Sequence, residues 1–158
     1  MRISVLSGRL GAIVAVSAAA AVAFGGSASA AFAPFYSSDM KANIYPTLTR
    51  APMGSYTGMR VSGTLNNTTA DADKTCYRYD LRSISTTGVV AASLTPAVTA
   101  CGHSSSTFGS PTSTLFPVGS AYPSTPTSAT YRLEQRICKR PAGITAVYSC
   151  DSWALLAS

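Results

Sequence analysis

Apolar and polar residues alternate along several short segments of this chain, as they do in β-strands with one buried face. In residues 59–65 the larger apolar side chains fall on odd positions, and in residues 75–84 and 130–138 apolar side chains alternate with charged ones. No stretch after residue 30 has the period of a long helix. The strands predicted in this way are residues 59–65, 75–84, 89–94, 130–138 and 144–153.

Turn-forming residues separate the predicted strands, at Asn66-Asn67, Pro96 and Pro141-Ala142-Gly143. Several short strands joined by turns predict an all-β fold. We expect a small antiparallel β-sandwich with immunoglobulin-like architecture, and a small β-barrel is the alternative.

The organisation of the chain changes along its length. Residues 31–55 contain three prolines and are predicted to form an extended N-terminal arm with no more than one short strand. Residues 56–158 form the predicted β-domain. Within it, residues 104–130 are rich in Ser, Thr and Pro, a composition typical of linkers. Apolar residues such as Phe116 interrupt this segment, so we expect an edge strand near residues 112–118.

The first thirty residues have the three parts of a Sec-type secretory signal peptide. Arg2 and Arg9 give a positive start, and residues 10–24 are an uninterrupted run of apolar and small residues. Ala28-Ser29-Ala30 then fits a signal-peptidase site. The apolar run is about 15 residues long, shorter than the roughly 20 needed to span a bilayer. We therefore expect cleavage after Ala30 and a secreted, extracellular protein with no membrane span.

Charge narrows the range of partners. Removal of residues 1–30 leaves ten Lys and Arg against six Asp and Glu, a net charge of +4. These residues form no dense basic cluster, so no nucleic-acid partner is expected. No cofactor is expected either. The alanine-rich leader is typical of a bacterial protein.

All four cysteines follow the predicted cleavage point, in an oxidising compartment, so we expect two disulfides. The pairing Cys76–Cys101 and Cys138–Cys150 is favoured because each bridge closes a local loop. No two cysteines have the close spacing of a zinc site, so no metal site is expected. Cys76 and Cys138 share the parity of the charged residues in their strands. They therefore lie either at strand ends or in bridges across the outer side of the sheet.

A near-repeat carries much of the charge of the predicted β-domain. Residues 77–82 and 131–136 both have the form aromatic-Arg-x-acid-x-Arg, which places Arg, acid and Arg on one face of each strand. If the two strands are antiparallel neighbours, the favourable register sets Arg78 against Glu134 and Asp80 against Arg132. The candidate binding face consists of Arg78, Arg82, Arg132 and Arg136.

This face has two interpretations. In the first, its charges neutralise one another and are simply solvated. In the second, its two excess positive charges dock an anionic cell-wall polymer or another extracellular protein. The sequence leaves both interpretations open.

Catalytic hypotheses have less support. His103 is the only histidine, and with Ser104 it suggests a small hydrolase, although no nucleophile motif surrounds it. Asp80 and Glu134 suggest a glycosidase pair, but arginines flank both acids and favour their ionised form, the wrong direction for a general acid. We therefore assign no catalytic residue.

Three further groups have an ordinary structural explanation. Asn66, Asn67, Asp71 and Asp73 offer oxygen ligands for calcium, but their spacing is that of a polar turn. Trp153 and the tyrosines suggest a sugar-stacking platform, but such residues more often belong to a core. Lys139-Arg140, in the ring closed by the second disulfide, suggests a protease-inhibitor loop.

The sequence as a whole favours a secreted, disulfide-stabilised and non-enzymatic β-domain that binds a partner outside the cell or at the cell envelope. A secreted protease inhibitor using Lys139-Arg140 is the alternative, and a small hydrolase is a weaker one. The identity of the partner does not follow from the sequence.

Overall fold

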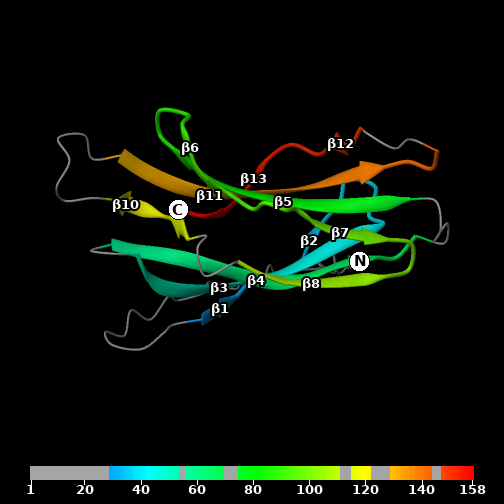
Figure 1. Ribbon diagram of the computed structural model, residues 1–158, viewed down its shortest axis with the longest axis horizontal. Coiled ribbons are helices and arrows are strands. Elements are labelled where there is room, and N and C mark those ends of the chain that lie inside the picture. Colours follow the sequence, from blue (N-terminus) through cyan, green and yellow to red (C-terminus); the bar gives the residue numbers. More distant parts are fainter. Residues whose placement is uncertain (1–28, 54–55, 70–74, 111–114, 122–128, 144–146) are drawn as a thin grey trace, which may run out of the picture.

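Two antiparallel β-sheets pack face to face in this protein (Figure 1). The computed structural model describes residues 29–53, 56–69, 75–110, 115–121, 129–143 and 147–158. These residues contain thirteen strands and no helix, so none of them belongs to a helix of membrane-spanning length. The predicted all-β sandwich is confirmed, and the barrel alternative is not adopted. Residues 1–28, which hold most of the predicted signal peptide, lie outside the described residues.

The first sheet, the lower layer of Figure 1, is built around two long neighbouring strands. Its path is β1-β3-β4-β8, with β2 also paired to β3 and β9 to β4. Its members are β1 (Ser29–Ala31), β2 (Phe35–Tyr36), β3 (Ala42–Met53), β4 (Tyr56–Asn67), β8 (Ser105–Gly109) and β9 (Phe116–Pro117).

The second sheet, the upper layer, is likewise built around two long strands, β5 and β11. Its path is β10-β11-β5-β6, with β7 also paired to β5, and with β12 and β13 paired to β11. Its members are β5 (Cys76–Ser85), β6 (Val90–Ser93), β7 (Val98–Cys101), β10 (Gly119–Ala121), β11 (Ala129–Arg140), β12 (Ser149–Cys150) and β13 (Ala154–Ala157).

The core lies between the sheets and follows from the alternation in the sequence. Every second residue of β5 points inward, and Tyr77 and Tyr79 are fully buried there. Phe108 of β8 crosses from the first sheet, with its ring centroid 5.3 Å from that of Tyr79. Gly63 of β4 is required by close packing, because a Cβ atom there would clash with the backbone carbonyl of Tyr45 and would lie 3.0 Å from the Phe108 ring. The other large buried side chains include Ile44, Val61, Leu65, Leu81, Phe116, Leu133 and Ile137.

The strands predicted at residues 59–65, 75–84 and 130–138 lie within β4, β5 and β11. The prediction of an extended arm with no more than one short strand was wrong for residues 42–53, which form the long strand β3. Pro46 had argued against a central strand there. Its carbonyl accepts from the Phe32 amide, so its missing N–H also faces the β1 side, and pairing with β4 is unaffected.

The segment after the turn at residues 141–143 also differs from the prediction, which was one strand over residues 144–153. The described part forms two short strands, β12 and β13, which pair with different parts of β11. Residues 151–153 leave the ladder between them, and residues 144–146 lie outside the described residues. In the Ser/Thr/Pro-rich segment, β9 falls within the edge strand expected near residues 112–118, whose residues 112–114 lie outside the described residues. The strand β8 was not predicted.

The two disulfides are Cys76–Cys101 and Cys138–Cys150, as predicted. Each joins residues that face each other on neighbouring strands, β5 with β7 and β11 with β12. Cys138 lies within β11, so its bridge runs across the outer side of the second sheet. Cys76 begins β5 and Cys101 ends β7, so the Cys76–Cys101 bridge lies at strand ends.

Candidate binding face: an arginine strip on the second sheet

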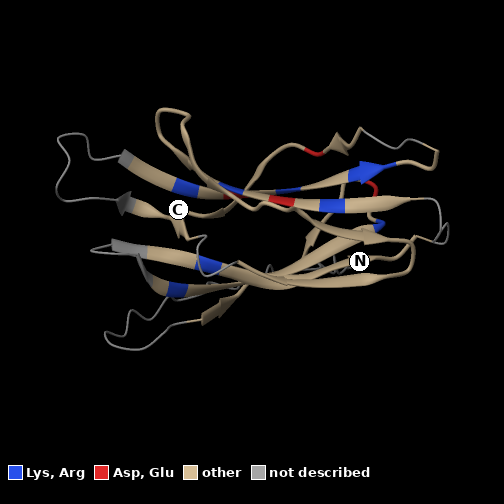
Figure 2. Ribbon diagram, in the orientation of Figure 1, with Lys and Arg blue, Asp and Glu red and all other residues tan. Residues whose placement is uncertain are grey.

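The near-repeats of the sequence lie side by side, because β5 and β11 are antiparallel neighbours over ten residue pairs. Their inward residues fill the core, so their charged residues share the outer face of the second sheet. Figure 2 shows most charged residues on this sheet and few on the first. We call this surface the arginine strip, defined by Arg78, Asp80, Arg82, Arg132, Glu134 and Arg136.

The register of the strip differs from the prediction, although opposite charges still face each other across the two strands. Asp80 lies opposite Arg136, and Arg82 lies opposite Glu134. The predicted pairs, Arg78 with Glu134 and Asp80 with Arg132, were wrong: the strands are offset in the other direction. Both offsets set opposite charges against each other and keep the inward residues of the two strands on the same side.

Each carboxylate of the strip is shared by two arginines. Glu134 lies 2.8 Å from Nη2 of Arg82 and 2.8 Å from Nε of Arg132. Asp80 lies 2.9 Å from Nη2 of Arg136 and 3.0 Å from Nε of Arg78. The Arg78 Nε contact has no hydrogen-bond geometry, but its Nη2 donates to Asp80 at 3.1 Å. The strip therefore consists of two triads, each with one carboxylate between two arginines, and it has two positive charges in excess.

Two aromatic rings hold the guanidinium groups from the side of the C-terminal segment. Trp153 lies between β12 and β13, and its ring centroid is 4.0 Å from Cζ of Arg82 and 4.2 Å from Cζ of Arg136. Tyr148 lies 4.5 Å from Cζ of Arg78. The prediction of core positions was wrong for these two aromatics, although it holds for Tyr77 and Tyr79. Such contacts contribute about 0.5–1 kcal/mol each at exposed sites.

The positive groups of the strip are more exposed than the negative ones. The side chains of Glu134 and Asp80 are 8% and 15% exposed, whereas that of Arg132 is 60% exposed. The other three arginines have values between 25% and 31%. Arg132 is therefore the group most accessible to a ligand from solvent, whereas the Trp153 and Tyr148 rings lie against the other three guanidinium groups.

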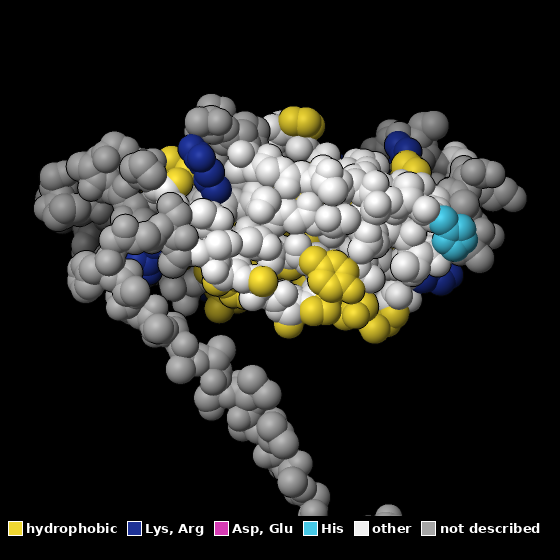
Figure 3. All heavy atoms as spheres, turned by 90° about the horizontal axis from the view of Figure 1, so that it is seen from below, with side chains coloured by type: hydrophobic (Ala, Val, Ile, Leu, Met, Phe, Trp, Pro, Cys, Tyr) yellow, Lys and Arg dark blue, Asp and Glu magenta, His cyan; other side chains and the backbone are white. Residues whose placement is uncertain are grey.

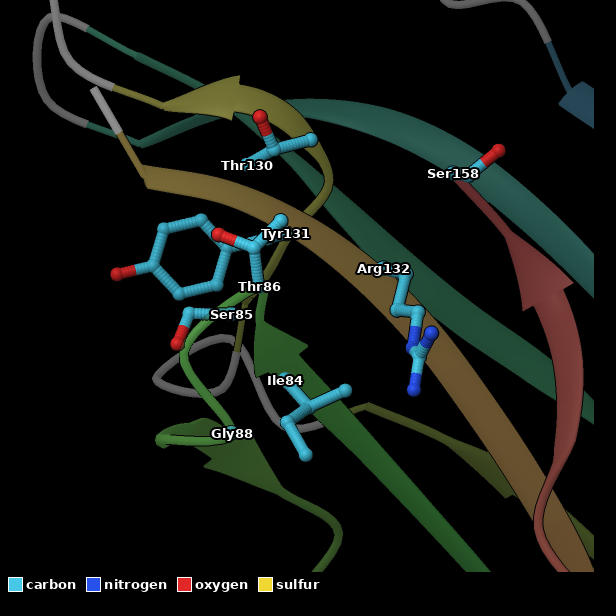
Figure 4. Close-up of a pocket in the computed structure, with 8 residues that line it drawn as sticks. All are labelled: Ile84, Ser85, Thr86, Gly88, Thr130, Tyr131, Arg132 and Ser158. Carbon is cyan, nitrogen blue, oxygen red and sulfur yellow. The ribbon is translucent and has the colours of Figure 1, made fainter.

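A cleft of about 250 Å³ opens beside Arg132 (Figure 4). It lies between the end of β5 with the turn that follows, the start of β11 and the C-terminal residue Ser158. Its surface is mainly apolar, and Ile84 and Tyr131 contribute to it. Arg132 thus belongs both to the strip and to the rim of the cleft.

A second polar cluster, which the sequence analysis did not predict, joins the two sheets at their other end. Asp39, in the turn between β2 and β3, accepts from the Tyr77 hydroxyl at 2.5 Å and from Nζ of Lys139 at 3.0 Å. Ser37 donates to the same carboxylate at 2.7 Å. Next to it, the amide and hydroxyl of Ser38 donate to Asp151 at 3.1 and 2.6 Å. We call these residues the Asp39 cluster.

The pKa values in this cluster are those of a structural contact. Partial burial alone would raise the pKa of Asp39, but hydrogen bonds from Tyr77, Ser37, Lys139 and the Lys41 amide together lower it well below its usual value. Burial, followed by the bond to Asp39, raises the pKa of Tyr77. At neutral pH the carboxylate is therefore ionised and the phenol protonated, so neither is poised for proton transfer.

The catalytic hypotheses gain no contact from the structure. Ser104 donates its hydroxyl to the Cys101 carbonyl, and no hydrogen bond in the described part of the chain joins it to His103. Asp80 and Glu134 are each held by two arginines.

The remaining candidate groups are placed as follows. Lys139 and Arg140 end β11 instead of lying in a loop; Lys139 binds Asp39, and Arg140 approaches the Tyr148 ring at 5.5 Å. Asn66 and Asn67 end β4 and bond to protein groups, whereas Asp71 and Asp73 lie outside the described residues. Asp80 also lies close to the sulfurs of the second disulfide, but oxidised sulfurs are not thiolate ligands.

No known protein family, curated protein or solved structure matches this chain.

Proposed function

We propose that this protein is a secreted, non-enzymatic binding domain that docks an anionic polymer of the cell envelope on the arginine strip. The observation that carries the proposal is the difference in exposure between the two signs of charge: the four arginine side chains are 25–60% exposed, whereas the two carboxylate side chains are 8% and 15% exposed. The two disulfides are consistent with an extracellular protein.

The contacts within the strip lower the cost of binding. A free arginine side chain loses rotamer freedom when it binds, at about 0.5–1.5 kcal/mol for each immobilised side chain. Here Arg82 and Arg136 are already fixed between a carboxylate and the Trp153 ring. Guanidinium groups also match the geometry of phosphate and carboxylate oxygens. The strip thus supports recognition of a repeated anion along an extended chain.

Arg132 is the group that a ligand meets first, because it is the most exposed of the four. Among the described residues its ion-pair partner is Glu134, and Glu134 keeps its bond to Arg82 when Arg132 is removed. Arg132→Ser therefore removes one exposed charge without leaving the carboxylate unpaired. The apolar cleft beside it offers further contact to a bound polymer.

Retention on immobilised polyphosphate at low ionic strength tests the proposal. Arg60, on β4 of the first sheet, is exposed and provides the matched control, because Arg60→Ser makes the same charge change on the opposite sheet. We expect Arg132→Ser to bind about threefold to tenfold more weakly than the wild type, as expected for a loss of about 0.7–1.4 kcal/mol. Arg60→Ser should bind nearly as the wild type does. Equal losses in the two variants would attribute binding to net charge and reject the strip.

A further inference from the structure

The outer face of the first sheet carries almost no charge. The inward residues of β3 and β4, such as Ile44 and Val61, are buried, so their neighbours in sequence point to solvent. We call the outward side of β3, β4 and β8 the hydroxyl face. Its members include Asn43, Thr47, Ser62, Thr64, Ser105 and Thr107.

The strand register arranges these side chains in rows across the sheet. Thr64 of β4 faces Tyr45 on one side and Thr107 on the other, and Ser62 faces Thr47. Successive rows are separated by two residues along each strand, about 7 Å, and neighbouring strands are about 4.8 Å apart. The result is a regular grid of hydroxyl groups on a continuous sheet surface.

Most of these hydroxyl groups are free to bond outside the protein. Within the described residues, the side chains of Thr47, Ser62, Thr64, Ser105 and Thr107 form no hydrogen bond with another protein group. The contrast is Asn66, whose amide donates to Asn43 at 3.1 Å. A hydroxyl group that already bonds to water exchanges it for a ligand hydroxyl at little cost.

Two exposed tyrosines lie on the same side of the sheet. Tyr45 is 47% exposed and Tyr36 is 41% exposed. Tyr36 of β2 pairs with Asn43, which lies two residues from Tyr45 along β3, so the two tyrosines are diagonal neighbours at about 7–8 Å. Figure 3 shows this face largely white, with hydrophobic side chains gathered at one margin and no acidic side chain in view.

We propose that the hydroxyl face binds an extended, uncharged polysaccharide. Tyrosine rings offer an apolar surface to the C–H side of a sugar ring, and their hydroxyls remain at the edge. The rows of Ser and Thr hydroxyls then exchange hydrogen bonds with the sugar hydroxyls. Arg60, near one end of β4, is the charged residue of this face, so the face matches an uncharged partner better than an anionic one.

This site is independent of the proposed function, because it lies on the opposite sheet from the arginine strip. High salt distinguishes binding at the hydroxyl face from binding at the arginine strip. The screening length falls to roughly 4 Å near 0.5 M salt, and this screening weakens binding to anions. We would therefore measure retention of the full chain on insoluble cellulose and chitin in about 0.5 M NaCl. The variants are Tyr45→Ala, Tyr36→Ala combined with Tyr45→Ala, and Arg132→Ser as the control.

We expect the wild type and Arg132→Ser to be retained alike, and each tyrosine variant to bind at least tenfold more weakly. Thermal unfolding of each variant checks that the fold is intact. Should the double variant fail to fold, Thr64→Val with Thr107→Val removes two hydroxyls at nearly constant shape, with at least a threefold loss expected. A wild type that neither polysaccharide retains, or retention that the tyrosine and threonine changes leave unaltered, would overturn the inference.

Discussion

The two outer faces of this sandwich are built by the same alternation and have opposite chemistry. On the second sheet, charged residues pair across β5 and β11, and Trp153 and Tyr148 lie against their guanidinium groups. On the first sheet, hydroxyl and amide groups occupy the equivalent positions, and Tyr45 is left exposed. The comparison teaches that a sandwich core constrains only the inward residues, so its two faces are free to take different ligands.

The faces also differ in how they are held. Both disulfides lie in the second sheet, one on each of the strands that carry the arginine strip. The first sheet has no disulfide among its described residues and depends on its long β3–β4 pairing. The disulfides therefore constrain the sheet with the charged face more directly than the sheet with the uncharged one.

Loss of a disulfide should lower the free energy of unfolding more than any other change proposed here. It should also show the clearest difference in stability between the two sheets. The Cys76–Cys101 bridge spans 25 residues, and removing it through Cys76→Ala with Cys101→Ala should lower the free energy of unfolding by about 3–4 kcal/mol. Urea unfolding measures this loss. Amide hydrogen exchange should rise more in β5 and β7 than in β3 and β4. A uniform rise in both sheets would contradict the view that the bridge acts on the second sheet.

Glu134→Gln should have the next largest effect, because Glu134 is nearly buried and accepts from both Arg82 and Arg132. Loss of its charge leaves two guanidinium groups without their partner. We expect a decrease of about 2–3 kcal/mol in the free energy of unfolding. Arg60→Ser on the other sheet should change it by less than about 0.5 kcal/mol. Equal stability of the two variants in urea would show that the network adds no stability.

Asp39→Asn should weaken the contact between the sheets by about 1–2 kcal/mol near neutral pH, because Tyr77 and Lys139 lose an ionised acceptor. The folded pKa of Asp39 is lowered from its usual value of 3.8. Its contribution is therefore present above that value and is lost as the pH falls toward the folded pKa. The stability gap between wild type and variant should narrow between about pH 5 and pH 2. A gap that is constant over this range would exclude the carboxylate charge as its cause.

Trp153→Phe should have the smallest effect, about 1 kcal/mol, because the ring over Arg82 and Arg136 is replaced by a smaller one with a weaker cation–π contact. The thermal unfolding temperature and the affinity for polyphosphate should both decrease slightly. Tyr45→Phe on the first sheet is the control and should leave both unchanged. A loss of polyphosphate binding as large as that of Arg132→Ser would instead indicate direct contact between Trp153 and the ligand.

Much of the fold was predictable because alternation, turns and cysteine spacing agree with one another. In β5, for example, charged side chains at Arg78 and Asp80 alternate with Tyr77, Tyr79 and Leu81, which fill the core. The strand β3 was missed because Pro46 argues locally against a strand. Only the arrangement of the strands beside β3 shows that the missing N–H of Pro46 faces the β1 side and not the β4 side.

The candidate site was predictable in composition but not in arrangement. The four arginines were identified from the near-repeat, yet more than one register of β5 and β11 satisfies the alternation. The packing of both sheets selects among them, and no local rule encodes it. The contact between Asp39 and Lys139 joins residues 100 positions apart, so nothing in the flanking sequence indicates it. The hydroxyl face was missed because single Ser and Thr residues in a strand carry no signal until the register aligns them.

The salt dependence of polyphosphate binding tests the arginine strip most directly. The affinity of the wild type, Arg132→Ser and Arg60→Ser would be measured between about 50 and 300 mM NaCl. The account predicts that the logarithm of affinity falls linearly with the logarithm of salt concentration, and that Arg132→Ser reduces the slope by about one while Arg60→Ser leaves it unchanged. A wild type that does not bind at low salt, or identical slopes in all three proteins, would contradict it.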